Sequence, residues 1–183
     1  ITGFITEGSN SAGAHLMGIL PHRGLAGNSQ EVAGLNVSEI TKNDLDLLLL
    51  FNAEPGKDIP SLSAEKLTNS LVIALTPYAT ENYKNTADIM LPIGTFAETS
   101  GTYVNCEERW QSFSGIANPV GESRPGWKVL RAIGSLLEMS DFEFDASKQL
   151  EQLGIMLEED VDQSPWKCIV DRAGGERWNR MCM

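Results

Sequence analysis

Three apolar runs of strand length dominate the hydrophobic pattern in the first half of the chain: Leu45 to Phe51, Leu71 to Leu75 and Ile89 to Leu91. Nearly continuous apolar runs of this length are typical of strands that are buried on both faces of a parallel sheet. The segments Ser63 to Ser70 and Thr80 to Thr86 favour short helices, each with a hydroxyl side chain at its first position. This alternation of strands and helices predicts an α/β layer with parallel strands, similar to a Rossmann fold.

Further elements are expected on both sides of this layer. Phe4 to Glu7 favours a strand, and Ala14 to Leu20 favours a helix or a turn. Residues 21–38 are rich in glycine, asparagine and serine, which predicts a surface loop. Tyr103 to Phe113 has the alternation of one extended run, and Trp127 to Leu137 has that of an amphipathic helix whose first residue anchors the core.

The character of the sequence changes after residue 137. We expect an α/β domain over residues 1–137 and an acidic, helical tail over residues 138–183, in which Ala146 to Leu157 has a helical apolar stripe. This tail is expected to be loosely ordered or to dock on another partner. Because the chain begins without methionine, we also expect it to be a fragment of a longer polypeptide.

The charge of the chain limits its partners. Its formal net charge is −11, and residues 138–162 alone contribute −8, from nine acidic residues against one lysine. Nucleic acid is therefore an unsuitable partner, since its phosphates need a basic surface. No apolar run approaches the ~20 residues of a membrane-spanning helix.

Cysteine and histidine spacing argues against a metal centre within this chain. Cys106, Cys168 and Cys182 include no Cys-x-x-Cys pair, so we expect no iron–sulfur cluster here. His15 and His22 are seven residues apart and have no acidic or cysteine neighbours, so a zinc site is not expected either.

Polar residues at the ends of the predicted strands are the candidate ligand contacts. In parallel sheets, ligands bind beyond the carboxyl ends of the strands. The residues expected there are Asn10, Asn52, Glu54, Thr76 and Thr80. The loop from Gly94 to Gly101 is rich in small and polar residues, and such loops carry contacts more often than core.

Residues 8–13, which read Gly-Ser-Asn-Ser-Ala-Gly, connect the first predicted strand to the first predicted helix. Two interpretations remain open: a tight connection with a polar N-cap, or a cradle of backbone N–H groups for an anion. A serine hydrolase that uses Ser11 and His15 is a weaker hypothesis, because the nucleophile elbow and a third triad member are missing.

A family resemblance is densest between residues 86 and 127. Residues 87–92 read A-D-I-M-L-P and residues 98–111 read E-T-S-G-T-Y-V-N-C-E-E-R-W-Q, and the match continues through Asn118-Pro119 and Gly126-Trp127. This pattern resembles the molybdopterin oxidoreductase superfamily, which reads A-D-x-x-L-P and then E-x-x-G-T-x-x-N-x-E-G-R-x-Q. Within it, the variant letters are most similar to the large iron–sulfur subunits of bacterial NADH:quinone oxidoreductases (respiratory complex I), and the resemblance covers residues 1–137.

The resemblance implies a nucleotide-binding α/β domain whose strand-end loops hold the guanine dinucleotide of a pterin. It places Asn52 to Pro55 on the family's G-x-N-P turn and Thr76 to Thr80 on its D-x-x-x-T turn. Both turns depart from the family pattern, because Glu54 replaces the asparagine and Thr76 replaces the aspartate. Glu108 also replaces the glycine of the E-G-R triplet. A carboxylate that faces a pyrophosphate is repulsive, and desolvation makes the repulsion more costly.

These departures lead to the expected function. The resemblance implies a non-catalytic structural domain of the iron–sulfur subunit, which supports electron transfer from NADH to quinone in the peripheral arm and holds no cofactor or metal itself. Iron–sulfur clusters are expected upstream, and the partners are the other domains of its subunit and other peripheral-arm subunits, on the cytoplasmic side of the membrane. The alternative is a cofactor-binding fragment of an active molybdopterin guanine dinucleotide oxidoreductase, with nucleotide contacts at Asn10, Asn52 and Thr80.

Overall fold

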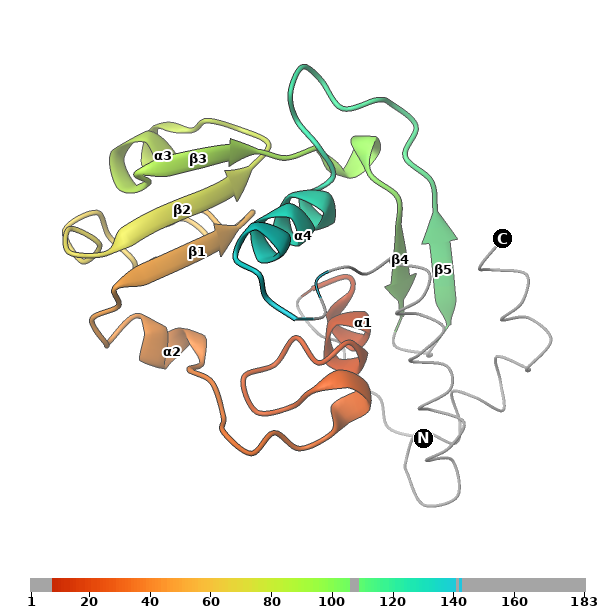
Figure 1. The fold of residues 1–183 in the computed structure, drawn as a ribbon, viewed down its shortest axis with the longest axis horizontal. Helices are drawn as coiled ribbons and strands as arrows, with labels where there is room; N and C mark the ends of the chain where they lie inside the picture. The colour runs from red at the N-terminus through yellow and green to blue at the C-terminus, as the bar shows by residue number, and fades with distance from the viewer. Residues whose placement is uncertain (1–7, 106–108, 141, 143–183) are drawn as a thin grey trace. The chain divides into compact units, whose positions relative to one another are not determined.

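The computed structural model of the protein describes residues 8–105, 109–140 and 142 (Figure 1). The chain forms two compact units, each built from separate segments of the sequence. Among the described residues, unit 1 contains residues 8–34, 101–105 and 109–113, and unit 2 contains residues 35–100, 114–140 and 142. The strand predicted over residues 4–7 and the helix predicted over residues 146–157 lie outside the described residues, as does most of the tail predicted over residues 138–183.

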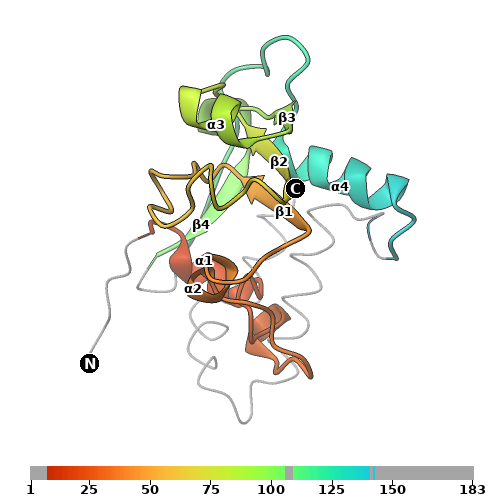
Figure 2. The ribbon, with the colours of Figure 1, turned by 90° about the vertical axis from the view of Figure 1, so that its left-hand side faces the viewer.

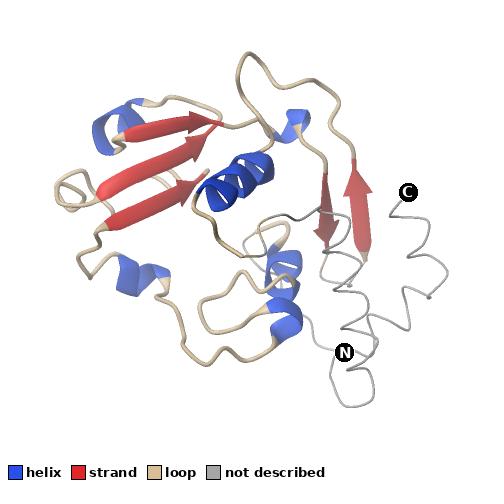
Figure 3. Cartoon of the chain, in the orientation of Figure 1, coloured by secondary structure: helices blue, strands red, loops and turns tan. Residues whose placement is uncertain are grey.

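A parallel three-stranded sheet forms the centre of unit 2 (Figures 1 and 3). Its strands are β1 (Leu47–Phe51), β2 (Leu71–Thr76) and β3 (Ile89–Pro92), in the order β1-β2-β3. Leu49 pairs with Ile73, which pairs with Ile89, so the three apolar runs lie in register. The predicted α/β fold with parallel strands is confirmed.

Short helices surround this sheet. They are α2 (Val37–Ile40), α3 (Glu81–Thr86), the 3-10 turn η2 (Phe96–Glu98) and α4 (Gly126–Leu136). The helices predicted over residues 80–86 and 127–137 are confirmed to within one residue. Figures 1 and 2 together show α3 and α4 on opposite sides of the sheet.

The prediction of a helix over residues 63–70 is wrong, because most of this segment forms turns. The Thr68 hydroxyl donates to the carbonyl oxygens of Ala64 (3.2 Å) and Glu65 (2.9 Å). Such local bonds from side chain to backbone compete with the helical ladder. With Asn69 and Ser70 following, the segment has too few strong helix formers to overcome that competition.

The core of unit 2 lies on one face of the sheet. Its buried members are Leu48, Leu50, Leu62, Leu67, Val72, Ala74 and Tyr83. Burial along β1 alternates, however: Leu50 is 3% exposed, whereas Leu47, Leu49 and Phe51 are 40–53% exposed. The prediction that β1 is buried on both faces is therefore wrong for the described part of the chain, in which every second side chain of this strand remains 40–53% exposed.

Unit 1 combines α1 (Ser11–Leu16) with a hairpin of β4 (Gly101–Val104) and β5 (Trp110–Phe113). The hairpin is antiparallel, with Thr102 opposite Ser112. The expected single extended run over residues 103–113 is thus two strands. Leu16 and Val104 form the buried cluster of this unit, against which Ala12 and Trp110 pack. A 3-10 turn, η1 (Leu25–Gly27), lies in the loop predicted over residues 21–38.

The first helix begins three residues earlier than its predicted start at Ala14 and ends before Gly18. Gly18 has a φ of +73°, and a Cβ there would collide with the backbone of Gly24 and Leu25. A glycine at this position lets the chain reverse directly after the helix. No helix of the described residues is long and apolar enough to cross a membrane.

Candidate functional site

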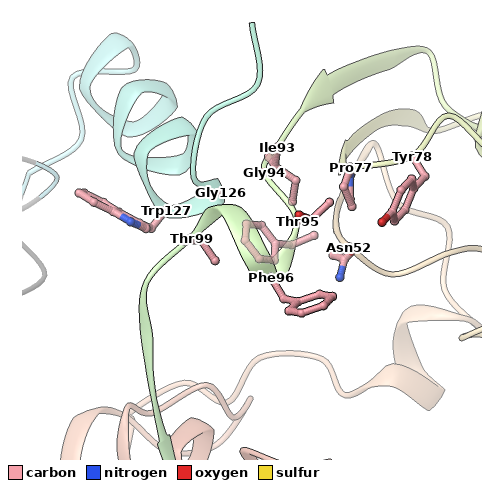
Figure 4. Close-up of a pocket in the computed structure, with 11 residues that line it drawn as sticks. Asn52, Pro77, Tyr78, Ile93, Gly94, Thr95, Phe96, Thr99, Gly126 and Trp127 are labelled. Atoms are coloured by element: carbon pink, nitrogen blue, oxygen red, sulfur yellow. The ribbon is translucent and has the colours of Figure 1, made fainter. Parts of the chain in front are cut away.

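A pocket of about 370 Å³ lies at the carboxyl ends of the three parallel strands (Figure 4). This is where ligands bind in open α/β sheets. Its described lining consists of Phe51, Asn52, Pro77, Tyr78, Ile93, Gly94, Thr95, Phe96, Thr99, Gly126 and Trp127. The loop from Gly94 to Gly101, which we expected to carry contacts, supplies four of these residues.

The backbone at the strand ends shapes the pocket. Asn52 directly follows β1. Its φ of +49° is one that asparagine tolerates better than most residues, and its N–H donates to the carbonyl oxygen of Leu75 (2.8 Å). Gly126 begins α4 beside the ring of Phe51, where a Cβ would lie 2.5 Å from a ring carbon. The absence of a side chain at Gly126 therefore allows the first turn of α4 to form one wall.

Four of the eleven described lining residues of the pocket are aromatic, and none is charged. These rings, of Phe51, Tyr78, Phe96 and Trp127, come from four separate segments, and the last three are labelled in Figure 4. Trp127, which we expected to be a core anchor, is half-buried, and Lys128 Nζ lies 5.3 Å from its ring centroid. None of the described lining residues carries a charge, so the pocket suits apolar or neutral polar groups.

Glu98 fixes the loop that carries Thr95, Phe96 and Thr99. Its Oε2 accepts hydrogen bonds from the Thr95 N–H (2.8 Å) and the Thr95 hydroxyl (3.0 Å), and its Oε1 accepts one from the Val120 N–H (3.2 Å). These bonds, chiefly the one from the Thr95 N–H, hold the pKa of the Glu98 carboxyl below its usual range. The ionised carboxylate therefore holds the pocket loop against residues 114–124.

A second carboxylate, Glu54, joins the end of β1 to the start of α3. Its Oε1 accepts from the Thr80 hydroxyl (2.7 Å) and the Asn82 amide (3.1 Å), and Lys57 Nζ lies 3.5 Å from its Oε2. The Glu54 side chain is only 12% exposed. Thr80 also caps α3, since its Oγ1 accepts from the Tyr83 N–H (3.4 Å). The sequence placed Glu54 and Thr80 at strand ends, and the structure brings them together.

Thr76 lies at the carboxyl end of β2 and is 6% exposed. Its hydroxyl donates to the Tyr78 carbonyl oxygen (3.0 Å) and accepts from the Tyr78 N–H (3.2 Å). Burial raises the pKa of the nearby Tyr83 phenol; a hydrogen bond with Thr76 opposes this shift, and the charges of Glu54 and Asp58 add to it. Thr76 thus fixes the turn after β2 and does not line the pocket.

Asn10 belongs to unit 1, where both ends of its amide bind β4. Its Nδ2 donates to the Thr102 carbonyl oxygen (3.1 Å), and its Oδ1 accepts from the Val104 N–H (2.8 Å). Of the two interpretations of residues 8–13, the contacts match a structural connection, although Asn10 makes no side-chain cap to α1.

The described residues contain no assembled catalytic group for the hydrolase hypothesis. The Ser11 hydroxyl donates to the Gly8 carbonyl oxygen (3.1 Å), and His15 is exposed on the same helix, with no hydrogen bond to Ser11 among the described contacts. No cluster of three or more histidine, cysteine, aspartate or glutamate side chains that could hold a metal ion occurs in the part of the chain that the structure describes.

The sequence did not predict the aromatic rings that line the pocket or the hydrogen bond from Asn82 to Glu54. Tyr78 and Phe96 lie on turns, where no hydrophobic period indicates which way a ring will point. Asn82 gave one usable signal: it follows the capping residue Thr80 by two positions, in the first turn of a helix that starts at a strand end.

Comparison with known proteins finds one family over most of the chain. Residues 5–136 match the model of the family described as molybdopterin oxidoreductase. The 78 kDa subunit of mitochondrial NADH-ubiquinone oxidoreductase from Candida albicans is 31% identical over 121 residues, which is 60% of this chain and 17% of that protein. Putative formate dehydrogenases from two Staphylococcus aureus strains, RF122 and USA300, are 41% and 39% identical over 51 residues, or 28% of this chain and 5% of each relative. The chain thus spans less than a fifth of the length of these relatives.

Proposed function

Because this chain belongs to the molybdopterin oxidoreductase family, we propose that it is a non-catalytic structural domain of the large iron–sulfur subunit of an NADH:quinone oxidoreductase. In this role the domain supports the electron-carrying part of its own subunit in the peripheral arm, on the cytoplasmic side of the membrane. Its partners are the other domains of that subunit and neighbouring peripheral-arm subunits. The similarity to the 78 kDa subunit of the Candida albicans enzyme supports this assignment.

The contacts of Glu54 are the main support for this proposal. A pterin guanine dinucleotide, the group that the family implies, would bring an anionic pyrophosphate to the carboxyl ends of the strands. At the end of β1 the donors of Thr80 and Asn82 are already bound to the Glu54 carboxylate. The described pocket lining offers no positive charge. A pyrophosphate fits this edge poorly, because it would meet a fixed negative charge and find its hydrogen-bond donors taken.

The alternative is a cofactor-binding fragment of an active molybdopterin guanine dinucleotide oxidoreductase. The local identity of 41% with a putative formate dehydrogenase favours it, as does the position of the pocket at the strand ends. In that case guanine nucleotides should bind near Asn52 and Thr80.

The cofactor content of the purified chain tests the two functions against each other. The chain is expressed in cells that make the molybdopterin cofactor, then purified and assayed for molybdenum by mass spectrometry and for guanine nucleotide after acid release. We expect neither above background, while an intact formate dehydrogenase prepared in parallel serves as the positive control. Stoichiometric molybdenum or guanine nucleotide would reject the structural role and establish the alternative.

A further inference from the structure

The donors around Glu54 form the ligand shell of an anion. A hydroxyl, a side-chain amide and an ammonium group converge on its carboxylate, from Thr80, Asn82 and Lys57 respectively. Hydroxyl, amide and ammonium donors of this kind also bind phosphate oxygens in proteins. Only 12% of the Glu54 side chain is exposed, so the carboxylate fills the space between these donors.

We propose that Glu54 is an internal anion, an inference that rests on the proposed function. Its carboxylate occupies the place of a bound phosphate and prevents phosphate-bearing ligands from binding at this edge of the sheet. The carboxylate makes the connection between the end of β1 and the start of α3 that an external anion would otherwise provide. The domain thus keeps its strand-end geometry without a nucleotide.

The charged groups around Glu54 further disfavour the binding of a phosphate at this edge. The Asp58 Oδ2 accepts the Glu54 backbone N–H at 2.7 Å, so a second carboxylate lies at the same turn. Lys57, the only cation in the described contacts of Glu54, is 71% exposed and offers weak compensation. An entering phosphate would have to displace Glu54 and approach Asp58, and like-charge juxtaposition strongly disfavours both steps.

Chemical rescue tests this role. Glu54→Ala vacates the space and leaves the Thr80 hydroxyl and the Asn82 amide without their acceptor. We expect its Tm to fall by about 5 °C or more, and inorganic phosphate to restore part of this loss because it binds and stabilises the folded state. The wild-type chain should gain no more stability from phosphate than from sodium chloride of equal ionic strength.

Glu81→Ala is the matched control. Glu81 lies on α3 and pairs with Lys84 at 2.7 Å, but its side chain is 80% exposed and fills no enclosed space. This variant loses the same charge, from the helix that Glu54 contacts, so it should show a small change in Tm and no rescue by phosphate. Glu54→Ser, which removes the charge and also vacates most of the space, provides a second test should Glu54→Ala fail to fold. By isothermal titration calorimetry it should bind phosphate at least about tenfold more tightly than the wild type.

The outcomes separate this inference from the proposed function. Rescue of Glu54→Ala by phosphate, without rescue of the wild type or of Glu81→Ala, supports the internal anion. Equal stabilisation of the wild type, or a failure of phosphate to bind either Glu54 variant, overturns it. The proposed function stands or falls separately, on whether the purified wild-type chain contains molybdenum or guanine nucleotide.

Discussion

Two glutamates determine how the loops at the strand ends are held. Glu54 binds the start of α3, and Glu98 binds the loop that begins at Thr95 together with the segment that contains Val120. Each carboxylate accepts from at least one distant donor: Thr80 is 26 residues from Glu54, and Val120 is 22 residues from Glu98. Hydrogen bonds to ionised acceptors are roughly twice as strong as neutral ones, so single residues can fix loops that have little hydrophobic core of their own.

The Thr80 hydroxyl makes two interactions: it caps α3 by accepting from the Tyr83 N–H, and it donates to the Glu54 carboxylate. We expect Thr80→Val, which keeps the shape and loses the oxygen, to reduce the free energy of unfolding by about 1–3 kcal/mol. Thr80→Ser keeps the hydroxyl and should cost about 0.5 kcal/mol or less. Urea unfolding followed by circular dichroism measures both variants. Equal losses in the two would show that the methyl group, not the hydroxyl, matters at this position.

The lowered pKa of the Glu98 carboxyl predicts how the stability of the protein changes with pH. Its ionised form is stabilised in the folded state, so its contribution is fully present above the pKa of an unfolded glutamate, about 4.3. The contribution is lost as the pH falls through the lower pKa of the folded state. We therefore expect Glu98→Gln to be less stable than the wild type at neutral pH, with a difference that shrinks below about pH 4. Urea unfolding over this pH range tests it, and a difference that grew on acidification would contradict the assignment.

At the scale of elements, the sequence predicts where the parallel strands lie, but it does not predict where one strand of the hairpin ends and the next begins. Parallel pairing of β1, β2 and β3 follows from short apolar runs separated by helix-forming segments. The split between β4 and β5 depends instead on Asn105, whose Oδ1 accepts from the Arg109 N–H (2.8 Å) and whose N–H donates to the Arg109 carbonyl oxygen (3.2 Å). An asparagine that makes such contacts inside an extended pattern leaves the strand periodicity unchanged, so the pattern alone does not reveal where the first strand ends.

Alternation along β1 gives a prediction for its two faces. Leu50 is 3% exposed within the core of unit 2, whereas its neighbour Leu49 is 40% exposed on the other face. Leu50→Ala should cost about 2–5 kcal/mol of unfolding free energy, and Leu49→Ala about 1 kcal/mol or less. Urea unfolding of the two variants provides a matched comparison of the same substitution in the same strand. A cost for Leu49→Ala as large as that for Leu50→Ala would show that this second face is covered in solution.

At the scale of the whole molecule, the candidate site is predictable in place but not in composition. The rule that ligands bind at the carboxyl ends of parallel strands correctly locates the pocket, and it anticipates Asn52 among its lining residues. It does not anticipate Phe96 or Trp127, because loop and helix-start rings are positioned by tertiary contacts that leave no periodic signal. Asn10 was assigned to this edge by the same rule, but its amide binds β4 within unit 1.

The unequal cores of the two units predict unequal local stability. Among the described residues, the buried cluster of unit 2 has seven members and that of unit 1 has two. Since local opening is easiest where few apolar contacts are buried, the amides of β4 should exchange with solvent deuterium at least about tenfold faster than those of Val72 and Ala74 in β2. Hydrogen exchange resolved by NMR measures this directly, and Asn10→Ala should accelerate exchange at Val104, whose N–H donates to Asn10, without affecting β2. Uniform exchange in both units, or equal acceleration in β2, would instead mean that the two units unfold as one cooperative structure.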